Sequence, residues 1–266
     1  MKTMTPSAPP LLTGDALQEE LSALLDETPG GAVLFDADGT LWADDVGHIC
    51  FEFACTNGLL RHESLEALRA EARAVDLPFG PDHTANELGL ALLDAYLQGR
   101  YDEKAAAETM VWAYAGYAED ELRRLIHEAL AYARHDSYLH RQVIRMVEFV
   151  RRRGGHAYVV SASPRIVIEE STRALGFAPN EVTGGVADRS DERFVARLAE
   201  PLPYGPGKVT AGKLLTGERP WLAAFGDSGF DLDLMAGARL AVGLGEKSAL
   251  LAGLPHHPRA VRLSPP

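Results

Sequence analysis

Two aspartates, Asp36 and Asp38, follow the apolar run 32–35 in the segment VLFDADGTLW. The run predicts a buried strand, and ligands of open α/β folds bind beyond the carboxyl ends of such strands. Carboxylates two positions apart on extended backbone point to the same side, and they suit a divalent cation or a nucleophile with a general acid. Gly39 permits a sharp turn to which Thr40 can hydrogen-bond, and Thr40 is also a candidate for contacting the substrate. The alternative is an ordinary aspartate-rich turn without chemistry, because Asp and Gly favour turns.

The segment YVVSASPRIVIEE offers hydroxyl groups at a strand-to-helix junction. We expect the strand to end at Ser161 and the helix to begin near Pro164, a favoured first helical residue. A hydroxyl and free backbone N–H groups at a helix start bind phosphate well, so Ser161 and Ala162 are candidates for contacting a phosphorylated substrate. For this segment alone, a simpler interpretation is that Ser161 or Ser163 caps the helix.

Lys208 and Lys213 lie in the segment YGPGKVTAGKLL. The Walker phosphate loop needs a glycine six residues before its lysine and a hydroxyl directly after it. For Lys208, Leu202 stands at the first glycine position of the motif and Val209 stands at the hydroxyl position. For Lys213 the hydroxyl position holds Leu214. The segment is therefore not expected to bind a nucleoside triphosphate in the Walker manner.

Asp227 and Asp231 follow another apolar run, in the segment LAAFGDSGFDLDLM. Acids four positions apart after a strand can close a magnesium site opposite the first aspartate pair, and Gly226 and Gly229 let the backbone turn tightly. A polar turn that leads into a helix is the alternative for this segment alone. Asp233 is expected on the outer face of that helix.

The elements that must position these residues follow from the hydrophobic pattern. Short apolar runs separated by helical patterns predict an α/β fold with a mainly parallel sheet. The expected strands cover residues 32–35, 157–160, 222–225, 240–244 and 260–263. Helices are expected at 15–27 and 138–153, and a hairpin within 181–203 is expected to turn around 188–190. The first ten residues and the last dozen are expected to be frayed or peripheral.

Residues 44–135 show no strand pattern. Apolar residues recur there at spacings of three and four, which predicts helices within 46–55, 65–75, 88–97, 105–117 and 122–132, with a break at 76–81. The chain is therefore expected to have a core domain made of 1–43 and 136–266, and a helical domain of residues 44–135 inserted between its two parts.

Composition excludes several classes of protein. The 266 residues are 46% hydrophobic and 24% charged, and the net charge of −12 disfavours binding to nucleic acid or anionic membranes. The first residues lack the apolar run of a signal peptide, and no stretch is apolar enough to span a bilayer, so a cytoplasmic location is expected. Cys50 and Cys55 are too few for a disulfide framework or a zinc site and are expected to be buried thiols.

Taken together and in this order, the four segments resemble the motifs of the haloacid dehalogenase superfamily of phosphohydrolases: strand-D-x-D-G-T-L, strand-S, a lysine, and strand-G-D-x-x-x-D. The helical insert directly after the first motif is similar to the small cap of the phosphoserine phosphatase branch. The resemblance implies a Rossmann-like parallel-sheet core with an inserted helical cap. It also implies a Mg²⁺-dependent phosphatase that hydrolyses a small phosphorylated metabolite through an aspartyl-phosphate.

The resemblance assigns roles to the matching residues. Asp36 is the implied nucleophile, and Asp38 the implied general acid and later base. Ser161 is expected to hydrogen-bond a phosphoryl oxygen, and Lys208 to neutralise the transferring group. Lys208 is preferred to Lys213 because it follows a glycine and precedes the expected helix. The implied Mg²⁺ ligands are Asp36, the backbone carbonyl of Asp38, Asp227 and, directly or through water, Asp231.

The substrate is less clearly indicated. Asp45 lies where the phosphoserine phosphatase branch has an acid that contacts a substrate amine. Two features depart from that branch, since Phe230 replaces its phosphate-binding Asn and Glu108 or a neighbour replaces the cap arginine that holds a carboxylate. Arg100 is a possible substitute for this arginine. The aromatic residues Trp42, Trp112, Tyr114 and Tyr117 offer faces for a cation such as choline phosphate, although aromatics at helical spacing more often form a core.

Alternatives remain for the reaction and the assembly. A phosphotransferase or phosphomutase uses the same aspartyl-phosphate and differs only in its acceptor. A non-catalytic domain that binds a phosphorylated ligand is a further alternative, although such proteins normally lose one of the catalytic carboxylates or the lysine. A homodimer is possible, and the sequence does not determine it.

Overall fold

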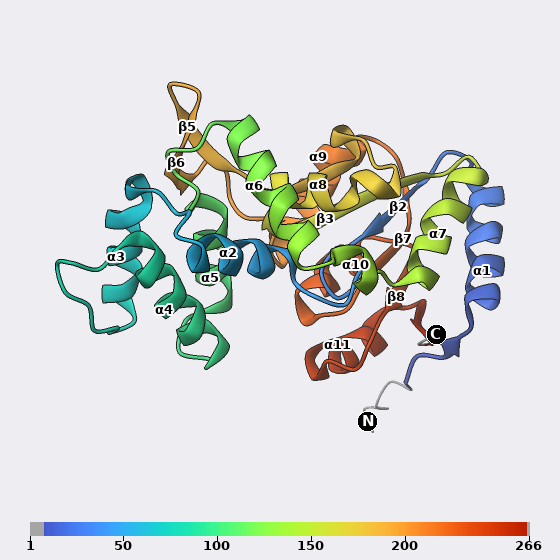
Figure 1. The fold of residues 1–266 in the computed structure, drawn as a ribbon. Coiled ribbons are helices and arrows are strands. Elements are labelled where there is room, and N and C mark those ends of the chain that lie inside the picture. Colours follow the sequence, from blue (N-terminus) through green and yellow to red (C-terminus); the bar gives the residue numbers. More distant parts are fainter. Residues whose placement is uncertain (1–7, 265–266) are drawn as a thin grey trace, which may run out of the picture.

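A seven-stranded sheet organises the computed structural model, which describes residues 8–264 (Figure 1). Its order is β1-β9-β8-β7-β2-β3-β4, and all neighbouring strands are parallel. The strands are β1 Leu11–Leu12, β2 Ala32–Phe35, β3 His156–Pro164, β4 Val182–Gly185, β7 Trp221–Gly226, β8 Leu240–Gly243 and β9 Ala260–Leu263. The predicted α/β fold with a parallel sheet is confirmed, and β2 lies between β7 and β3 near its centre.

Helices cover both faces of the sheet. Side chains alternate along β2, so that Val33 and Phe35 pack with α1 (Gly14–Glu27) and α7 (Arg141–Arg152), whereas Leu34 packs on the opposite face. That opposite face is covered by α9 (Pro206–Thr216), α10 (Leu232–Ala236) and α11 (Ser248–Gly253). Burial on both faces explains why β2, β7 and β8 are continuous apolar runs.

Five helices separate β2 from β3 in the chain: α2 Val46–Thr56, α3 Leu65–Ala74, α4 Ala85–Leu97, α5 Glu103–Trp112 and α6 Glu119–Tyr132. In Figure 1, α3 and α4 lie farthest from the sheet. The hairpin of β5 (Ala187–Ser190) and β6 (Arg193–Leu198) joins this helical group, because Phe194 exchanges backbone hydrogen bonds with Gly116 and Tyr117. The hairpin lies outside residues 44–135 in the sequence, in the part assigned to the core domain, but it contacts the helical insert.

The structure differs from several local predictions. The hairpin turns at Asp191 and Glu192, which have positive φ, while residues 188–190 belong to β5. The strand β3 continues past Ser161 to Pro164, with an irregular register against β4. Helix α9 begins at Pro206, so Lys208 lies inside its first turn. The short strand β1 and the strand β4 were not predicted as strands. The predicted strand β9 pairs with β1 at the edge of the sheet, so this part of the termini is peripheral and not frayed.

Short 3-10 turns connect several elements, at His62–Ser64, His135–Tyr138, Arg173–Leu175, Pro179–Glu181, Gly229–Asp231 and Leu254–His256. The turn at His135–Tyr138 occupies the place where the helix now called α7 was expected to start. Within residues 8–264, none of the helices has both the length and the apolar character that crossing a membrane requires. Cys50 and Cys55 are buried free thiols, as predicted.

Candidate active site

Three adjacent strands bring the candidate residues to one edge of the sheet. Asp36 directly follows β2, Ser161 lies near the end of β3, and Asp227 directly follows β7. The backbone N–H of Asp36 donates to the carbonyl of Phe225 at 2.9 Å, which ties the first strand end to the third. These three residues line one cavity together with Asp38 and Lys208. The strand ends therefore bring together residues separated by up to 191 positions in the sequence.

Lys208 links two of the acids inside the protein. Its Nζ donates to Asp36 Oδ1 and to Asp231 Oδ1, each at 2.5 Å, and only 4% of Lys208 is exposed. Burial lowers the pKa of Lys208, but the charges and hydrogen bonds of Asp231 and Asp36 outweigh it and hold the pKa above its usual range. Lys208 therefore stays positively charged at neutral pH. Lys213, one turn farther along α9, is exposed, as expected.

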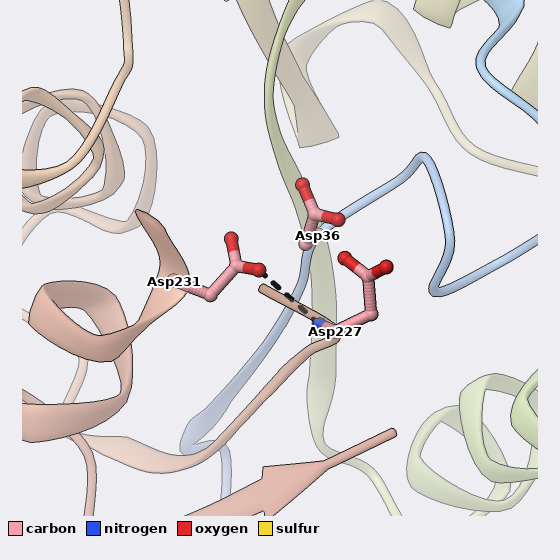
Figure 2. Close-up of side chains that lie close together, drawn as sticks. All are labelled: Asp36, Asp227 and Asp231. Carbon is pink, nitrogen blue, oxygen red and sulfur yellow. Dashed lines mark hydrogen bonds between the residues drawn. The ribbon is translucent and has the colours of Figure 1, made fainter. Parts of the chain in front are cut away.

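Asp36, Asp227 and Asp231 form a buried acidic cluster (Figure 2). Each offers a carboxylate oxygen, and these oxygens lie within 4.8 Å of one another. Burial and the negative charge of Asp231 raise the pKa of Asp36 well above its usual range, and burial also raises the pKa of Asp227. Oxygen ligands this close together, in a place where negative charge is in excess, fit a hard divalent cation such as Mg²⁺.

Asp231 is held in place by the turn that precedes α10. Its Oδ2 accepts hydrogen bonds from the backbone N–H groups of Asp227 and Ser228 and, at 2.7 Å, from the Ser228 hydroxyl. Figure 2 shows the bond from Asp227 and the three carboxylates converging from separate elements. Asp231 thus has a fixed position from which Oδ1 contacts Lys208.

Gly39 is required by the close approach of two motifs. Its φ is +77°, a conformation that residues with a side chain rarely adopt. A Cβ atom at this position would also lie 2.0 Å from Asp227 Oδ2. The glycine of the D-x-D-G segment therefore allows both the turn after β2 and the packing of that turn against Asp227.

The Asp38 side chain lies outside the acidic cluster. Its Oδ1 accepts hydrogen bonds from Trp42 Nε1 and from the backbone N–H of Val46, both at 2.8 Å, and its Oδ2 accepts one from the Ser163 hydroxyl at 2.7 Å. Burial and the nearby charge of Asp45 raise the pKa of Asp38 to about 6, although these hydrogen bonds oppose the shift. Asp38 is thus a carboxyl group that can exchange a proton near neutral pH.

The other residues predicted to contact substrate differ in their placement. Ser161, Ala162 and Asp45 line the cavity. The Ser161 oxygen accepts a hydrogen bond from the backbone N–H of Ser163 at 3.0 Å. Thr40 is fully buried and its hydroxyl donates to Asp36 Oδ2 at 3.2 Å, so it holds the Asp36 carboxylate rather than facing the cavity.

Sequence reasoning missed several residues that line the cavity, among them Tyr96, Glu103, Tyr204 and Lys247. Lys247 Nζ forms an ion pair with Asp227 Oδ2 at 2.5 Å. It comes shortly after β8, so the strand-end argument used for Asp36 could have identified it. Tyr96 and Glu103 lie on helices of the insert, where facing depends on packing and no motif marks them.

Other candidates lie away from the cavity. Arg100 pairs with Asp94 at 3.6 Å on an exposed surface, and Glu108 pairs with Lys104 at 3.4 Å. The four aromatic residues considered for cation binding are at most 7% exposed: Trp42, Trp112, Tyr114 and Tyr117. They belong to the hydrophobic core of the molecule. Trp42 nevertheless serves the site through its hydrogen bond to Asp38.

A comparison with protein families identifies the arrangement. A family model described as haloacid dehalogenase-like hydrolase matches residues 33–236, which include all four motifs. The chain belongs to this hydrolase family. The expected family membership is thereby confirmed. No curated protein sequence matches the chain significantly.

Solved structures share the fold of this hydrolase. A protein of unknown function from Anaerococcus prevotii DSM 20548 has a TM-score of 0.68 and 14% identity, covering 98% of this chain and 94% of that chain. One from Bordetella pertussis Tohama I has a TM-score of 0.64 and 21% identity, covering 86% and 97% respectively. A substrate-bound phosphoserine phosphatase has a TM-score of 0.51 and 13% identity, covering 88% and 93%. At these identities, the likeness concerns the fold.

Proposed function

We propose that this hydrolase cleaves a phosphate monoester of a small molecule, with Mg²⁺ as its cofactor. One observation carries the proposal: a buried carboxylate, Asp36, contacts a buried lysine in a cavity that also contains a second carboxyl group, Asp38. A nucleophile, a fixed positive charge and a proton donor are the groups that phosphoryl transfer to a carboxylate requires. The phosphoserine phosphatase of similar fold acts on a phosphate ester of this kind, which supports the proposal.

In the first step, an Asp36 carboxylate oxygen attacks phosphorus and the bond to the ester oxygen breaks. Lys208 lies 2.5 Å from Asp36, so its positive charge offsets the repulsion between carboxylate and phosphate. Asp38 gives its proton to the leaving oxygen, which departs as an alcohol. The raised pKa of Asp38, about 6, leaves a useful protonated fraction for this task near neutral pH.

In the second step, water attacks the phosphorus of the aspartyl-phosphate. Asp38, now ionised, takes a proton from this water, and the bond between phosphorus and the Asp36 oxygen breaks. Inorganic phosphate leaves and the Asp36 carboxylate is restored. Ser161 lines the same cavity, where its hydroxyl can donate to a phosphoryl oxygen in both steps.

Asp36, Asp227 and Asp231 are the residues that would hold Mg²⁺, because their oxygens lie within 4.8 Å of one another. The ion would withdraw negative charge from the phosphoryl group and favour the ionised form of Asp36. The Asp38 carboxylate is committed to Trp42, Val46 and Ser163, so we assign it no side-chain contact to the ion.

Hydrolysis of p-nitrophenyl phosphate by the purified protein tests this function. Turnover is expected with Mg²⁺, and loss of turnover is expected with EDTA and in Asp36→Asn. Asp233→Asn is the matched control, because Asp233 undergoes the same chemical change on the exposed face of α10. Turnover that persists without metal and in Asp36→Asn would refute the proposal. Adding an alcohol and finding its phosphate ester as the main product would instead indicate a phosphotransferase.

A further inference from the structure

The cavity is also lined by residues that the proposed phosphate chemistry does not use, and we call the part of the cavity that these residues line its second end. Tyr96, in the last turn of α4, and Glu103, in the first turn of α5, come from the helical insert. Tyr204 and Phe230 come from the core, and their ring centroids are 4.3 Å apart. Asp45 lines the cavity as well, so this end contains two acids and three aromatic rings. It is the part of the cavity that remains for the alcohol portion of the substrate.

The carboxylates at this end lie close to the phenol rings. After burial, the negative charges of Glu103 and Asp45 are the causes that raise the pKa of Tyr96. Burial and then Glu103 likewise raise the pKa of Tyr204. All four of these residues line the same cavity, so the acids and the rings surround a common space.

The two acids differ in their hydrogen bonds to the rest of the protein. Asp45 caps α2, and its Oδ1 accepts a hydrogen bond from the backbone N–H of His48 at 2.8 Å. Within residues 8–264, the carboxylate of Glu103 forms no hydrogen bond or ion pair. An acid in the first turn of a helix is stabilised by the helix dipole, which explains why a Glu is tolerated there but leaves its carboxylate available to a ligand.

Positive groups at this end are scarce. Among the residues lining the cavity the bases are Lys208 and Lys247, and no arginine is present. Lys208 is shared between Asp36 and Asp231, and Lys247 is paired with Asp227. The charge of Lys247 also reaches Glu103 and Asp45, where it opposes the upward pKa shift that burial causes. A substrate carboxylate or second phosphate would therefore meet Asp45 and Glu103 without a guanidinium partner, which is an unfavourable arrangement.

We propose that the alcohol portion of the substrate carries an ammonium group and no carboxylate, and that Glu103 and Asp45 hold this cation against the rings of Tyr96 and Tyr204. The inference rests on the proposed function, because the phosphate-binding residues determine which end of the cavity the alcohol occupies. Carboxylates and electron-rich ring faces both attract ammonium and quaternary ammonium groups. Phosphate esters of small amino alcohols have this chemistry.

Steady-state kinetics with matched esters test the inference. We compare choline phosphate with 3,3-dimethylbutyl phosphate, a neutral isostere in which carbon replaces nitrogen, and ethanolamine phosphate with phosphoserine, which adds a carboxylate. The expected kcat/KM is at least about tenfold higher for choline phosphate than for its isostere, and higher for ethanolamine phosphate than for phosphoserine. Equal values for choline phosphate and its isostere, or a preference for phosphoserine, would overturn the inference.

The proposed function is tested separately in the same assay by p-nitrophenyl phosphate. Turnover of that ester without any preference for cationic esters rejects the ammonium site and leaves the phosphatase standing. If the protein hydrolyses none of these esters, the proposed function is rejected, and the ammonium site is rejected with it.

The variant Glu103→Gln tests the residue directly. It is expected to lower the ratio of kcat/KM for choline phosphate to that for its isostere by about fivefold or more, since a carboxylate contact to the cation is lost. The ratio is taken within one variant, so partial misfolding cancels. Glu108→Gln on the same helix, whose carboxylate pairs with Lys104 outside the cavity, should keep the wild-type ratio. An unchanged ratio in Glu103→Gln would exclude Glu103 as the cation-binding residue.

Discussion

Carboxylates are buried in two regions of this enzyme, at the carboxyl edge of the sheet and between α6 and α8 (Arg165–Thr172). At the sheet edge, Lys208 is shared by Asp36 and Asp231, and Asp227 and Asp38 lie in the same cavity. The acids there outnumber the buried lysine, and burial raises the pKa of Asp36 and of Asp38.

Between α6 and α8 the charges are balanced. Arg123 of α6 contacts Glu169 at 2.6 Å and Glu170 at 2.9 Å, both on α8 (Arg165–Thr172). Arg165 contacts Glu169 at 2.8 Å, and Arg173 contacts Glu170 at 2.5 Å. Each of these nearly buried carboxylates therefore has two arginine partners. We call this group the Arg123 network.

The difference distinguishes a structural charge cluster from a chemical one. A network in which each acid has its own cation stabilises the contact between the insert and the core and has little affinity for a further ion. A cluster with excess negative charge is electrostatically unfavourable by itself, and a bound cation relieves this cost. Four predictions test the comparison.

Loss of Lys208 should have the largest effect. Lys208→Gln removes the positive charge that offsets repulsion between Asp36 and phosphate, so turnover of p-nitrophenyl phosphate should fall by about 10³-fold. Lys213→Gln, an exposed lysine on the same helix, should retain wild-type turnover. Activity of Lys208→Gln within a factor of about ten of wild type would show that this lysine is not part of the chemistry.

Loss of Arg123 should affect stability instead of turnover. Arg123→Met leaves Glu169 and Glu170 with one arginine each, and the free energy of unfolding should fall by roughly 2–3 kcal/mol. Urea denaturation measures the change, and Arg124→Met, at the exposed neighbouring position, provides the control. The rate per folded molecule should stay close to wild type. A larger loss of rate than of stability would place Arg123 in the reaction.

Addition of Mg²⁺ should stabilise the cluster at the sheet edge alone. At a free concentration 100 times its Kd, the ion should raise the free energy of unfolding by about 2.7 kcal/mol. Thermal unfolding with Mg²⁺ and with EDTA measures the effect. Asp227→Asn should lose the shift, whereas Asp233→Asn and Arg123→Met should keep it. An equal shift in Asp227→Asn would locate the binding site elsewhere.

The two regions should respond to pH with opposite signs. The folded-state pKa of Asp38, about 6, exceeds its ordinary value of 3.8, so its contribution to stability is present below pH 4 and is lost as the pH rises through 6. Glu119 of α6 also contacts Arg123, at 2.6 Å, and so borders the Arg123 network. Hydrogen bonds from Arg189 and Arg123 lower the pKa of Glu119, so its contribution to stability is present above its ordinary pKa of 4.5 and is lost as the pH falls.

Urea denaturation without added metal, between pH 4 and 7, measures both responses. As the pH rises, the free energy of unfolding of wild type should fall by on the order of 2 kcal/mol relative to that of Asp38→Asn. Solvent that reaches the carboxyl group makes this difference smaller. The advantage of wild type over Arg123→Met should shrink as the pH falls. If both differences in the free energy of unfolding, wild type against Asp38→Asn and wild type against Arg123→Met, changed in the same direction with pH, the distinction between balanced and unbalanced clusters would be contradicted.

Much of the sheet and of the candidate site could be predicted from the sequence, and the same feature, the apolar runs, explains both. The strand at 32–35 was predicted with the bounds that the structure shows, because a fully buried strand is a continuous apolar run. The strand at 260–263 was also predicted with its observed bounds, although its residues alternate between buried and half-buried and include Arg262. Asp36 and Asp227 follow such runs directly, so their place at the carboxyl edge depends on chain order alone. The hairpin turn and the first turn of α9 were misplaced, since both depend on contacts with residues distant in the sequence.

By itself, the sequence determined the family, the parallel α/β fold and the types of chemical group at the ends of its strands. Only the tertiary structure decided which groups meet. It directed Asp38 toward Trp42 and Ser163, joined Lys208 to both Asp36 and Asp231, and brought Glu103 from the insert to the cavity. The physical reason is that a strand end fixes a position along the chain, whereas the direction of a helical side chain is set by what the helix packs against.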